Sequence, residues 1–145
     1  MRFPWSTRLV CAFQYRGDAQ RFFRALGERL EKFKLELSAE KTHIISFSRF
    51  RQKENTTFEF LGFEFRWGKS RKGKDSLQRR TSRSKLRKSI VAFKEWCKEN
   101  RNNRIRNLIP KLNRKLRGYY NYYGLIGNYK SLSQFHMAMM KILYK

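Results

Sequence analysis

The sequence has 145 residues, which is enough for one ordinary domain or two very small ones. It holds 35 Lys and Arg residues against 11 Asp and Glu residues, a formal net charge of +24 at pH 7, so a polyanion is the expected partner. Because 40% of the residues are hydrophobic and 16% are aromatic, composition excludes a merely disordered cationic tail.

The first apolar segments predict a strand followed by a helix. Residues 9–13 are short and apolar and end near Gly17, which is typical of a buried strand. Residues 18–37 follow with an amphipathic helix, for which Gly17 and Asp18 supply an N-cap. The apolar positions that recur at helical spacing are Phe22, Phe23, Leu26, Leu30 and Phe33.

Two further segments predict strands. Residues 42–47 are β-branched and favour a second strand. Residues 58–65 alternate apolar and polar side chains, but the phase slips by one position beside Gly62. That slip predicts either a strand pair or a bulged strand at the glycine. Residues 1–65 therefore form an incomplete α+β unit, which on its own exposes a sheet edge.

Residues 66–88 are dense in positive charge. They contain eleven Lys or Arg residues, one Asp and two glycines, with no apolar period before Leu86, which is typical of a flexible basic connector. Self-repulsion on this scale favours contact with phosphates over a purely solvated linker. The candidate phosphate-binding residues are Arg66, Lys69, Arg71, Lys72, Lys74, Arg79, Arg80, Arg83, Lys85, Arg87 and Lys88.

Residues 89–145 predict a bundle of three helices. The first stripe runs from Leu86 to Cys97, and the second follows from Ile105 to Tyr119 or Tyr120. Pro110 lies inside the second stripe, so it marks the first turn of a shorter helix or kinks a longer one. The third stripe comprises Leu132, Phe135, Met139 and Ile142 or Leu143, with Ser131 or Ser133 as the expected N-cap.

A block of tyrosines lies next to cations in the second stripe. Tyr119 and Tyr123 are expected in the core, whereas core and outward positions are equally open for Tyr120 and Tyr122. An outward ring beside Arg114, Lys115 and Arg117 is suited to stack on an unpaired base while the cations hold phosphates. This combination favours RNA over a generic polyanion.

The same region resembles a known family. Leu112-Asn113 and the run KLRGYYNYYG at 115–124 resemble the maturase-specific domain at the C-terminus of group II intron reverse transcriptases. Residues 93–97 and 80–83 are similar to the preceding helix and its start. The resemblance identifies the hairpin of Phe60, Leu61, Gly62 and Phe63 with the polymerase primer grip, so it implies a small palm remnant at 1–65, the connector at 66–88 and a thumb-like domain at 89–145.

The chain departs from this family at its catalytic motif. The family has Tyr-Ala-Asp-Asp immediately before the strand at 9–13, and its two carboxylates hold the metal ions of nucleotide transfer. This chain has Trp5, Ser6, Thr7 and Arg8 there. Two-metal catalysis needs carboxylates fixed near each other, and no other acidic cluster replaces the pair. We therefore expect no catalytic residues, no metal site, no cofactor and no polymerase activity.

The cellular compartment follows from the cysteines and the hydropathy. Cys11 and Cys97 are far apart and have apolar sequence neighbours, so we expect buried free thiols in a reducing cytoplasm. No apolar run approaches the roughly 20 residues that cross a bilayer. A cytoplasmic protein is predicted.

Three functions remain open from the sequence. The first is an RNA-binding module that docks on structured group II intron RNA and assists its folding and splicing. The second is the distal fragment of a split or frameshifted RNA-directed DNA polymerase, which would act only with an upstream reverse-transcriptase fragment. The third is a relic without function, against which the intact spacing of the tyrosine block argues.

Overall fold

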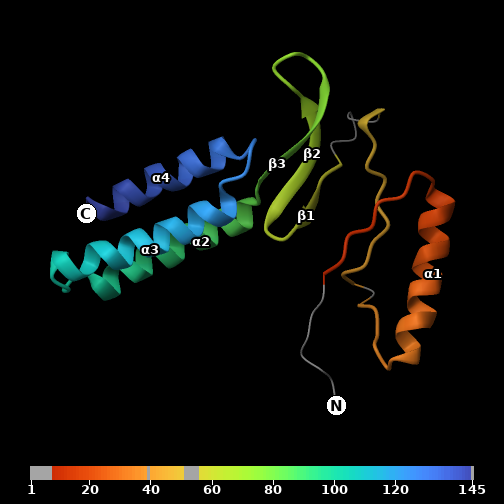
Figure 1. The fold of residues 1–145 in the computed structure, drawn as a ribbon, viewed down its shortest axis with the longest axis horizontal. Helices are drawn as coiled ribbons and strands as arrows, with labels where there is room; N and C mark the ends of the chain where they lie inside the picture. The colour runs from red at the N-terminus through yellow and green to blue at the C-terminus, as the bar shows by residue number, and fades with distance from the viewer. Residues whose placement is uncertain (1–7, 39, 51–55, 145) are drawn as a thin grey trace. The chain divides into compact units, whose positions relative to one another are not determined.

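The computed structural model describes residues 8–38, 40–50 and 56–144. They form two compact units, one up to Ser48 and the other from Arg49. The second unit contains a sheet and helices, which confirms the predicted α+β class with a helical C-terminal region. In Figure 1 the sheet is drawn in yellow-green and the C-terminal helices in green to blue.

The first unit contains helix α1, Arg16–Lys32. The predicted helix is thus confirmed over most of its length, and it ends before Lys34, which has a φ of 58°. Phe13 packs on Phe22 of α1 with ring centroids 5.2 Å apart. No side chain of α1 is buried.

The strands predicted at 9–13 and 42–47 are wrong. Neither segment forms a strand, and Leu9, Val10 and Ile44 are exposed rather than buried. A strand needs a neighbouring strand to pair its backbone amides and carbonyls. Among residues 8–38 and 40–48 there is no such neighbour, because all strands of the described chain lie in the second unit.

The second unit begins with an antiparallel sheet in the order β1-β2-β3. Its strands are β1 (Phe58–Phe60), β2 (Phe63–Lys69) and β3 (Asp75–Thr81). The predicted strand pair at Gly62 is confirmed. Leu61 and Gly62 have φ values of 49° and 81°, and positive φ at both central residues suits a tight two-residue hairpin.

The flexible connector predicted for residues 66–88 is wrong as a description of structure. These residues continue β2, form β3 and begin a helix. The sequence pattern hid the hairpin because its apolar and charged partners lie on different strands: Trp67 pairs with Leu77, and Glu64 pairs with Arg80. Periodicity within one segment does not show such cross-strand pairs.

Three helices complete the second unit, as predicted, and lie side by side in Figure 1. They are α2 (Arg83–Asn100), α3 (Ile105–Tyr123) and α4 (Tyr129–Leu143). Each contributes one buried residue to the central cluster of Phe93, Leu112 and Met139. The ring of Phe135 on α4 also contacts Phe93, with centroids 6.1 Å apart.

The helix ends settle two open points. Pro110 lies inside α3, so α3 is the longer of the two alternatives. The caps predicted at Ser131 and Ser133 are wrong, because α4 already begins at Tyr129 with Asn128 as its N-cap residue. By contrast, Ser82 caps α2 by accepting a hydrogen bond from the Lys85 amide.

Two predictions about buried thiols and membranes are also addressed by the structure. Cys11 is exposed and Cys97 is half-buried, so the prediction that both are buried is wrong. Burial nevertheless raises the pKa of the Cys97 thiol, against a smaller opposing effect of Lys115. No helix within the described part of the chain is long and apolar enough to cross a membrane.

Candidate nucleic-acid interface

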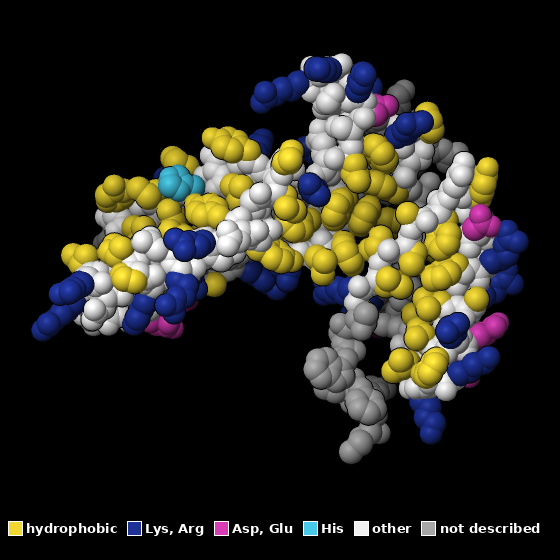
Figure 2. Space-filling view, in the orientation of Figure 1, with side chains coloured by type: hydrophobic (Ala, Val, Ile, Leu, Met, Phe, Trp, Pro, Cys, Tyr) yellow, Lys and Arg dark blue, Asp and Glu magenta, His cyan; other side chains and the backbone are white. Residues whose placement is uncertain are grey.

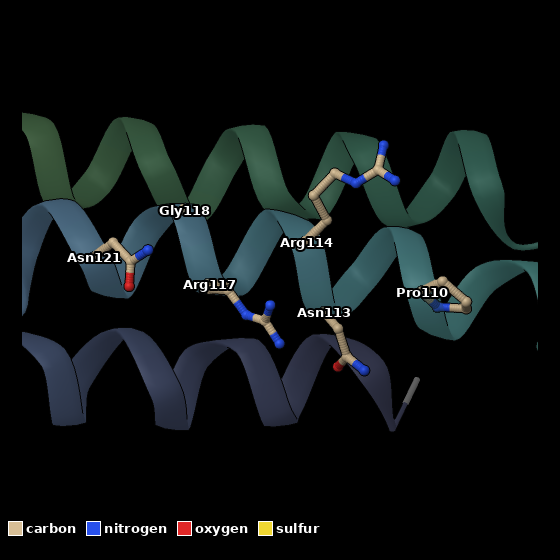
Figure 3. Close-up of a pocket in the computed structure, with 6 residues that line it drawn as sticks. All are labelled: Pro110, Asn113, Arg114, Arg117, Gly118 and Asn121. Carbon is tan, nitrogen blue, oxygen red and sulfur yellow. The ribbon is translucent and has the colours of Figure 1, made fainter.

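One face of α3 carries an open hollow. It has a volume of about 390 Å³ and is lined by Pro110, Asn113, Arg114, Arg117, Gly118 and Asn121. These positions recur at the three- and four-residue spacing that puts side chains on one face of a helix. Figure 3 shows that the side chains of Arg114 and Arg117 leave α3 in different directions, one toward each neighbouring helix. The face therefore presents two guanidinium groups, with the amide side chains of Asn113 and Asn121 on either side of them along the helix.

This face has no acidic neighbours along the chain. Glu99 is the last acidic residue, so α3 and α4 contain none. Among residues 8–38, 40–50 and 56–144, no ion pair includes a side chain of α3 or α4. Arg114 and Arg117 are both exposed. Their positive charge is thus directed to solvent, where a phosphate backbone can meet it.

The predicted cations of the hairpin fall into two groups. Arg66, Arg71, Lys72 and Lys74 are exposed, and Lys69 is exposed but forms an ion pair with Asp75 at 2.9 Å. Arg79 and Arg80 are half-buried and engaged inside the unit. The Arg80 guanidinium lies 2.6 Å from the Glu64 carboxylate, and Arg79 Nε donates to the Ile126 carbonyl at 3.4 Å.

The remaining predicted cations lie on helices. Arg83, Lys85, Arg87 and Lys88 are exposed on the first turns of α2. Lys115 lies over the Trp96 ring, with its ammonium 5.6 Å from the ring centroid, so part of its contact is with its own bundle. Figure 2 shows Lys and Arg side chains at the hairpin tip and along the helices, with few acidic side chains among them.

Most tyrosines of this block pack against other side chains of the helical bundle. Tyr119 stacks on Phe135 with centroids 3.7 Å apart, and burial, with smaller effects of Tyr123 and Tyr120, raises its pKa well above the usual range. Tyr120 is half-buried and its hydroxyl lies 3.4 Å from His136 Nδ1. Tyr122 is the more open of the two predicted stacking residues, with 51% of its surface exposed.

The comparison with family models covers this helical region. Residues 83–144 match the model of the group II intron, maturase-specific domain. This part of the chain is therefore similar to a group II intron maturase-specific domain. The match begins at the first residue of α2, includes α3 and ends one residue after α4. It confirms the resemblance for this part of the chain. Neither the curated proteins nor the solved structures contain a significant match.

The maturase-specific domain connects the chain to the splicing of group II introns. The match does not extend to residues 1–82, so the polymerase palm remnant at residues 1–65 stays a prediction. Trp5, Ser6 and Thr7, which stand where the family has its catalytic motif, lie outside the described residues.

The predicted primer-grip residues contact the maturase-specific domain directly. Phe60, Leu61, Gly62 and Phe63 form the β1–β2 turn and its flanks. The Tyr122 hydroxyl donates to the Leu61 carbonyl at 2.8 Å, and Phe63 packs on Tyr122 with centroids 5.8 Å apart. The turn is thus held against the C-terminal end of α3.

Sequence reasoning missed a buried asparagine that joins sheet and helices. The Asn128 side chain is fully buried, and its Oδ1 accepts from the Thr81 amide at 2.7 Å. Its Nδ2 donates to Thr81 Oγ1 and to the Tyr123 carbonyl, both at 2.8 Å. We call these three hydrogen bonds the Asn128 clasp. The available signal was Gly127-Asn128, which reads as an ordinary helix break.

Proposed function

We propose that the maturase-specific domain of this chain binds group II intron RNA and stabilises the folded intron, so that the RNA catalyses its own splicing. The observation that carries the proposal is the acid-free face of α3 with Arg114 and Arg117, within a domain that matches this family. The protein supplies affinity and positioning, and the chemistry belongs to the RNA.

Contact with the phosphate backbone suits this face. Guanidinium groups bind phosphate oxygens through two parallel hydrogen bonds, and the amides of Asn113 and Asn121 add donors and acceptors on the same face. The grooves of double-stranded RNA offer little sequence information to side chains, so shape and phosphate spacing carry the recognition. We therefore expect preference for folded RNA over an unstructured polyanion.

Base stacking by Tyr122 is a second part of the proposal. Half of the surface of the residue is exposed although its hydroxyl is hydrogen-bonded to the Leu61 carbonyl. An anchored ring with an open face can stack on a splayed base without losing further side-chain freedom. Tyr120 is less suited to this role because it is half-buried beside Phe135, with ring centroids 6.3 Å apart.

The proposal is tested by equilibrium binding to a transcribed group II intron RNA, with heparin as competitor. The Arg114→Ala/Arg117→Ala variant should lose affinity for the intron RNA. Arg21→Ala/Lys98→Ala is the matched control, since it removes the same charge from two exposed cations that already pair with carboxylates. Equal binding by both variants, or equal affinity of the natural protein for heparin and intron RNA, contradicts the proposal.

Assistance of splicing needs its own measurement. The self-splicing rate of the intron RNA at limiting Mg²⁺ should rise when the natural protein is added, because binding to the folded RNA shifts its folding equilibrium. The α3 variant should raise the rate less than the matched control does. No rise with the natural protein would refute the maturase role and leave RNA binding alone.

A second candidate function is the distal part of a split RNA-directed DNA polymerase. The observation that favours it is the first unit, where α1 buries no side chain and Phe22 and Phe33 are 38% and 67% exposed. An upstream reverse-transcriptase fragment would cover such side chains. Primer extension by the two fragments together, and by neither alone, would support this function. Absence of extension from the mixture would refute it.

A further inference from the structure

The tip of the β2–β3 hairpin is a built structure that displays cations. The Ser70 amide donates to the Lys74 carbonyl at 2.8 Å, and the Gly73 amide donates back to the Ser70 carbonyl at 2.9 Å. Gly73 has a φ of 74°, which suits glycine. The Lys74 amide also donates to Ser70 Oγ at 3.2 Å. This turn holds Arg71, Lys72 and Lys74 at the tip.

The cations of the tip are exposed to solvent and have no carboxylate partner among residues 8–38, 40–50 and 56–144. Arg71, Lys72 and Lys74 are exposed, and none of them forms an ion pair in the described chain. Asp75, the nearest acidic residue in the sequence, pairs with Lys69. In Figure 2 the tip shows as a group of Lys and Arg side chains. It is a second cationic surface besides the α3 face.

The two surfaces are far apart in one unit. The β1–β2 turn, at the other end of β2 from the tip, contacts α3 at Tyr122. From that contact the hairpin extends about 20 Å along the seven residues of β2, and Arg114 lies about 12 Å back along α3. Figure 1 shows the hairpin rising away from the bundle. About 20 Å of strand and about 12 Å of helix therefore lie between the tip and Arg114 along the fold.

Several hydrogen bonds fix that separation. The Asn128 clasp ties the end of β3 to the start of α4, and the Ser82 amide donates to the Gly62 carbonyl at 2.9 Å. The bond between Arg79 and the Ile126 carbonyl joins β3 to the α3–α4 loop. Sheet and helices belong to the same compact unit. The hairpin is thus mounted on the helical domain at several points.

We propose that the second unit binds RNA at two separate points, the hairpin tip and the α3 face, which the Asn128 clasp holds at a fixed spacing. This inference rests on the proposed RNA-binding function and specifies its partner. The partner is an RNA fold large enough to present phosphates to both points at once. A short stem occupies one point at a time.

Two-point binding has a recognisable signature. Once one point is bound, the second binds at a high effective concentration, so the affinity for a spanning RNA greatly exceeds that of either point. A variant that lacks one point therefore loses the whole gain in affinity for a spanning RNA. A short RNA can bind at either point, so such a variant still binds it at the remaining point. Its affinity for the short RNA then falls about twofold when the two points are of similar strength.

The experiment compares three double variants of the full chain, each lowering the net charge by the same amount. They are Arg71→Ala/Lys72→Ala at the tip, Arg114→Ala/Arg117→Ala on α3, and the control Arg21→Ala/Lys98→Ala. The probes are the transcribed intron RNA and an RNA stem-loop of about five base pairs, whose A-form stem is chosen to be too short to reach both points along its axis. All substituted side chains are exposed, so the fold should persist, and a circular dichroism melt checks it.

Two-point binding predicts losses of affinity that depend on the RNA. Relative to the control, both the tip variant and the α3 variant should lose about tenfold or more on the intron RNA, and about twofold or less on the short stem-loop. Equal fold-losses on the two RNAs would overturn two-point binding. A tip variant that equals the control on intron RNA, while the α3 variant binds weakly, would also overturn it but leave the proposed function intact. Failure of the α3 variant to differ from the control contradicts the proposed function itself.

Discussion

Replacement of Asn128 by alanine should strongly destabilise the second unit. The substitution removes all three hydrogen bonds of the clasp and leaves the Thr81 amide and hydroxyl without their partner. Thr81 is only 2% exposed, so water does not readily replace the asparagine. A buried polar group left without a hydrogen-bond partner costs about 1 to 3 kcal/mol. The Tyr123 carbonyl should contribute less to this cost because its bond to Asn128 is only partly buried. We expect the free energy of unfolding to fall by about 2 to 4 kcal/mol.

A graded pair of variants isolates the cause. Thr81→Val removes the hydroxyl that accepts from Asn128 Nδ2 but keeps the bond from the Thr81 amide, so it should cost only about 1 kcal/mol. Asn102→Ala is the control, because Asn102 is an exposed asparagine in the α2–α3 connection. The assay is urea unfolding followed by tryptophan fluorescence, to which Trp67 and Trp96 of this unit contribute.

The order of the three urea unfolding midpoints shows whether the Asn128 clasp holds sheet and helices together. The clasp predicts that the urea midpoint of Asn102→Ala lies close to that of the natural protein. The midpoint of Thr81→Val should be lower, and that of Asn128→Ala should be the lowest. If Asn128→Ala unfolds within about 0.5 kcal/mol of Asn102→Ala, the size of a typical surface substitution, the hydrogen bonds do not hold sheet and helices together.

Three further predictions concern the turn, the tyrosine and the chemistry. Gly62→Ala should destabilise the second unit by roughly 1 to 2 kcal/mol, because the φ of 81° at this position is left-handed. Gly118→Ala on the open α3 face should stabilise the unit by roughly 0.5 to 1 kcal/mol, because a Cβ there meets no atom within 4 Å. Thermal melts in which both variants shift in the same direction would contradict these two expectations. Tyr122→Ala should weaken intron RNA binding by roughly 1 to 3 kcal/mol, while Tyr122→Phe keeps the ring and binds normally; equal losses for the two would show that the hydroxyl matters instead. The purified chain with Mg²⁺ should extend no primer, and incorporation above that of a heat-inactivated sample would disprove the absence of polymerase activity.

Helices were predictable because their signal is local. The stripes through Phe93, Leu112 and Phe135 each repeat within one segment at helical spacing, and each forms a helix that buries that side. Pro110 could not be resolved in the same way. Its position inside α3 depends on where the helix begins, and no strong cap marks Ile105, since Arg104 makes no side-chain cap bond.

Strands and the clasp were less predictable because their partners are distant in sequence. Residues 9–13 have strand composition but find no neighbouring strand, whereas β3 has a charged, loop-like composition and pairs fully with β2. Likewise, Arg80 was assigned to RNA from its charge, although Glu64 on the opposite strand pairs with it. Asn128 and Thr81 are 47 residues apart in the sequence, so no local pattern indicates their contact.

Contact between the α3 face and RNA phosphates is tested most directly by the salt dependence of binding. The affinity for intron RNA is measured across a series of salt concentrations for the natural protein, Arg114→Ala/Arg117→Ala and Arg21→Ala/Lys98→Ala. Each phosphate contact contributes roughly 0.7 to 0.9 to the slope of log affinity against log salt. Loss of two contacts should flatten the slope by roughly 1.4 to 1.8 in the α3 variant and leave it unchanged in the control. An unchanged slope in the α3 variant would contradict the account.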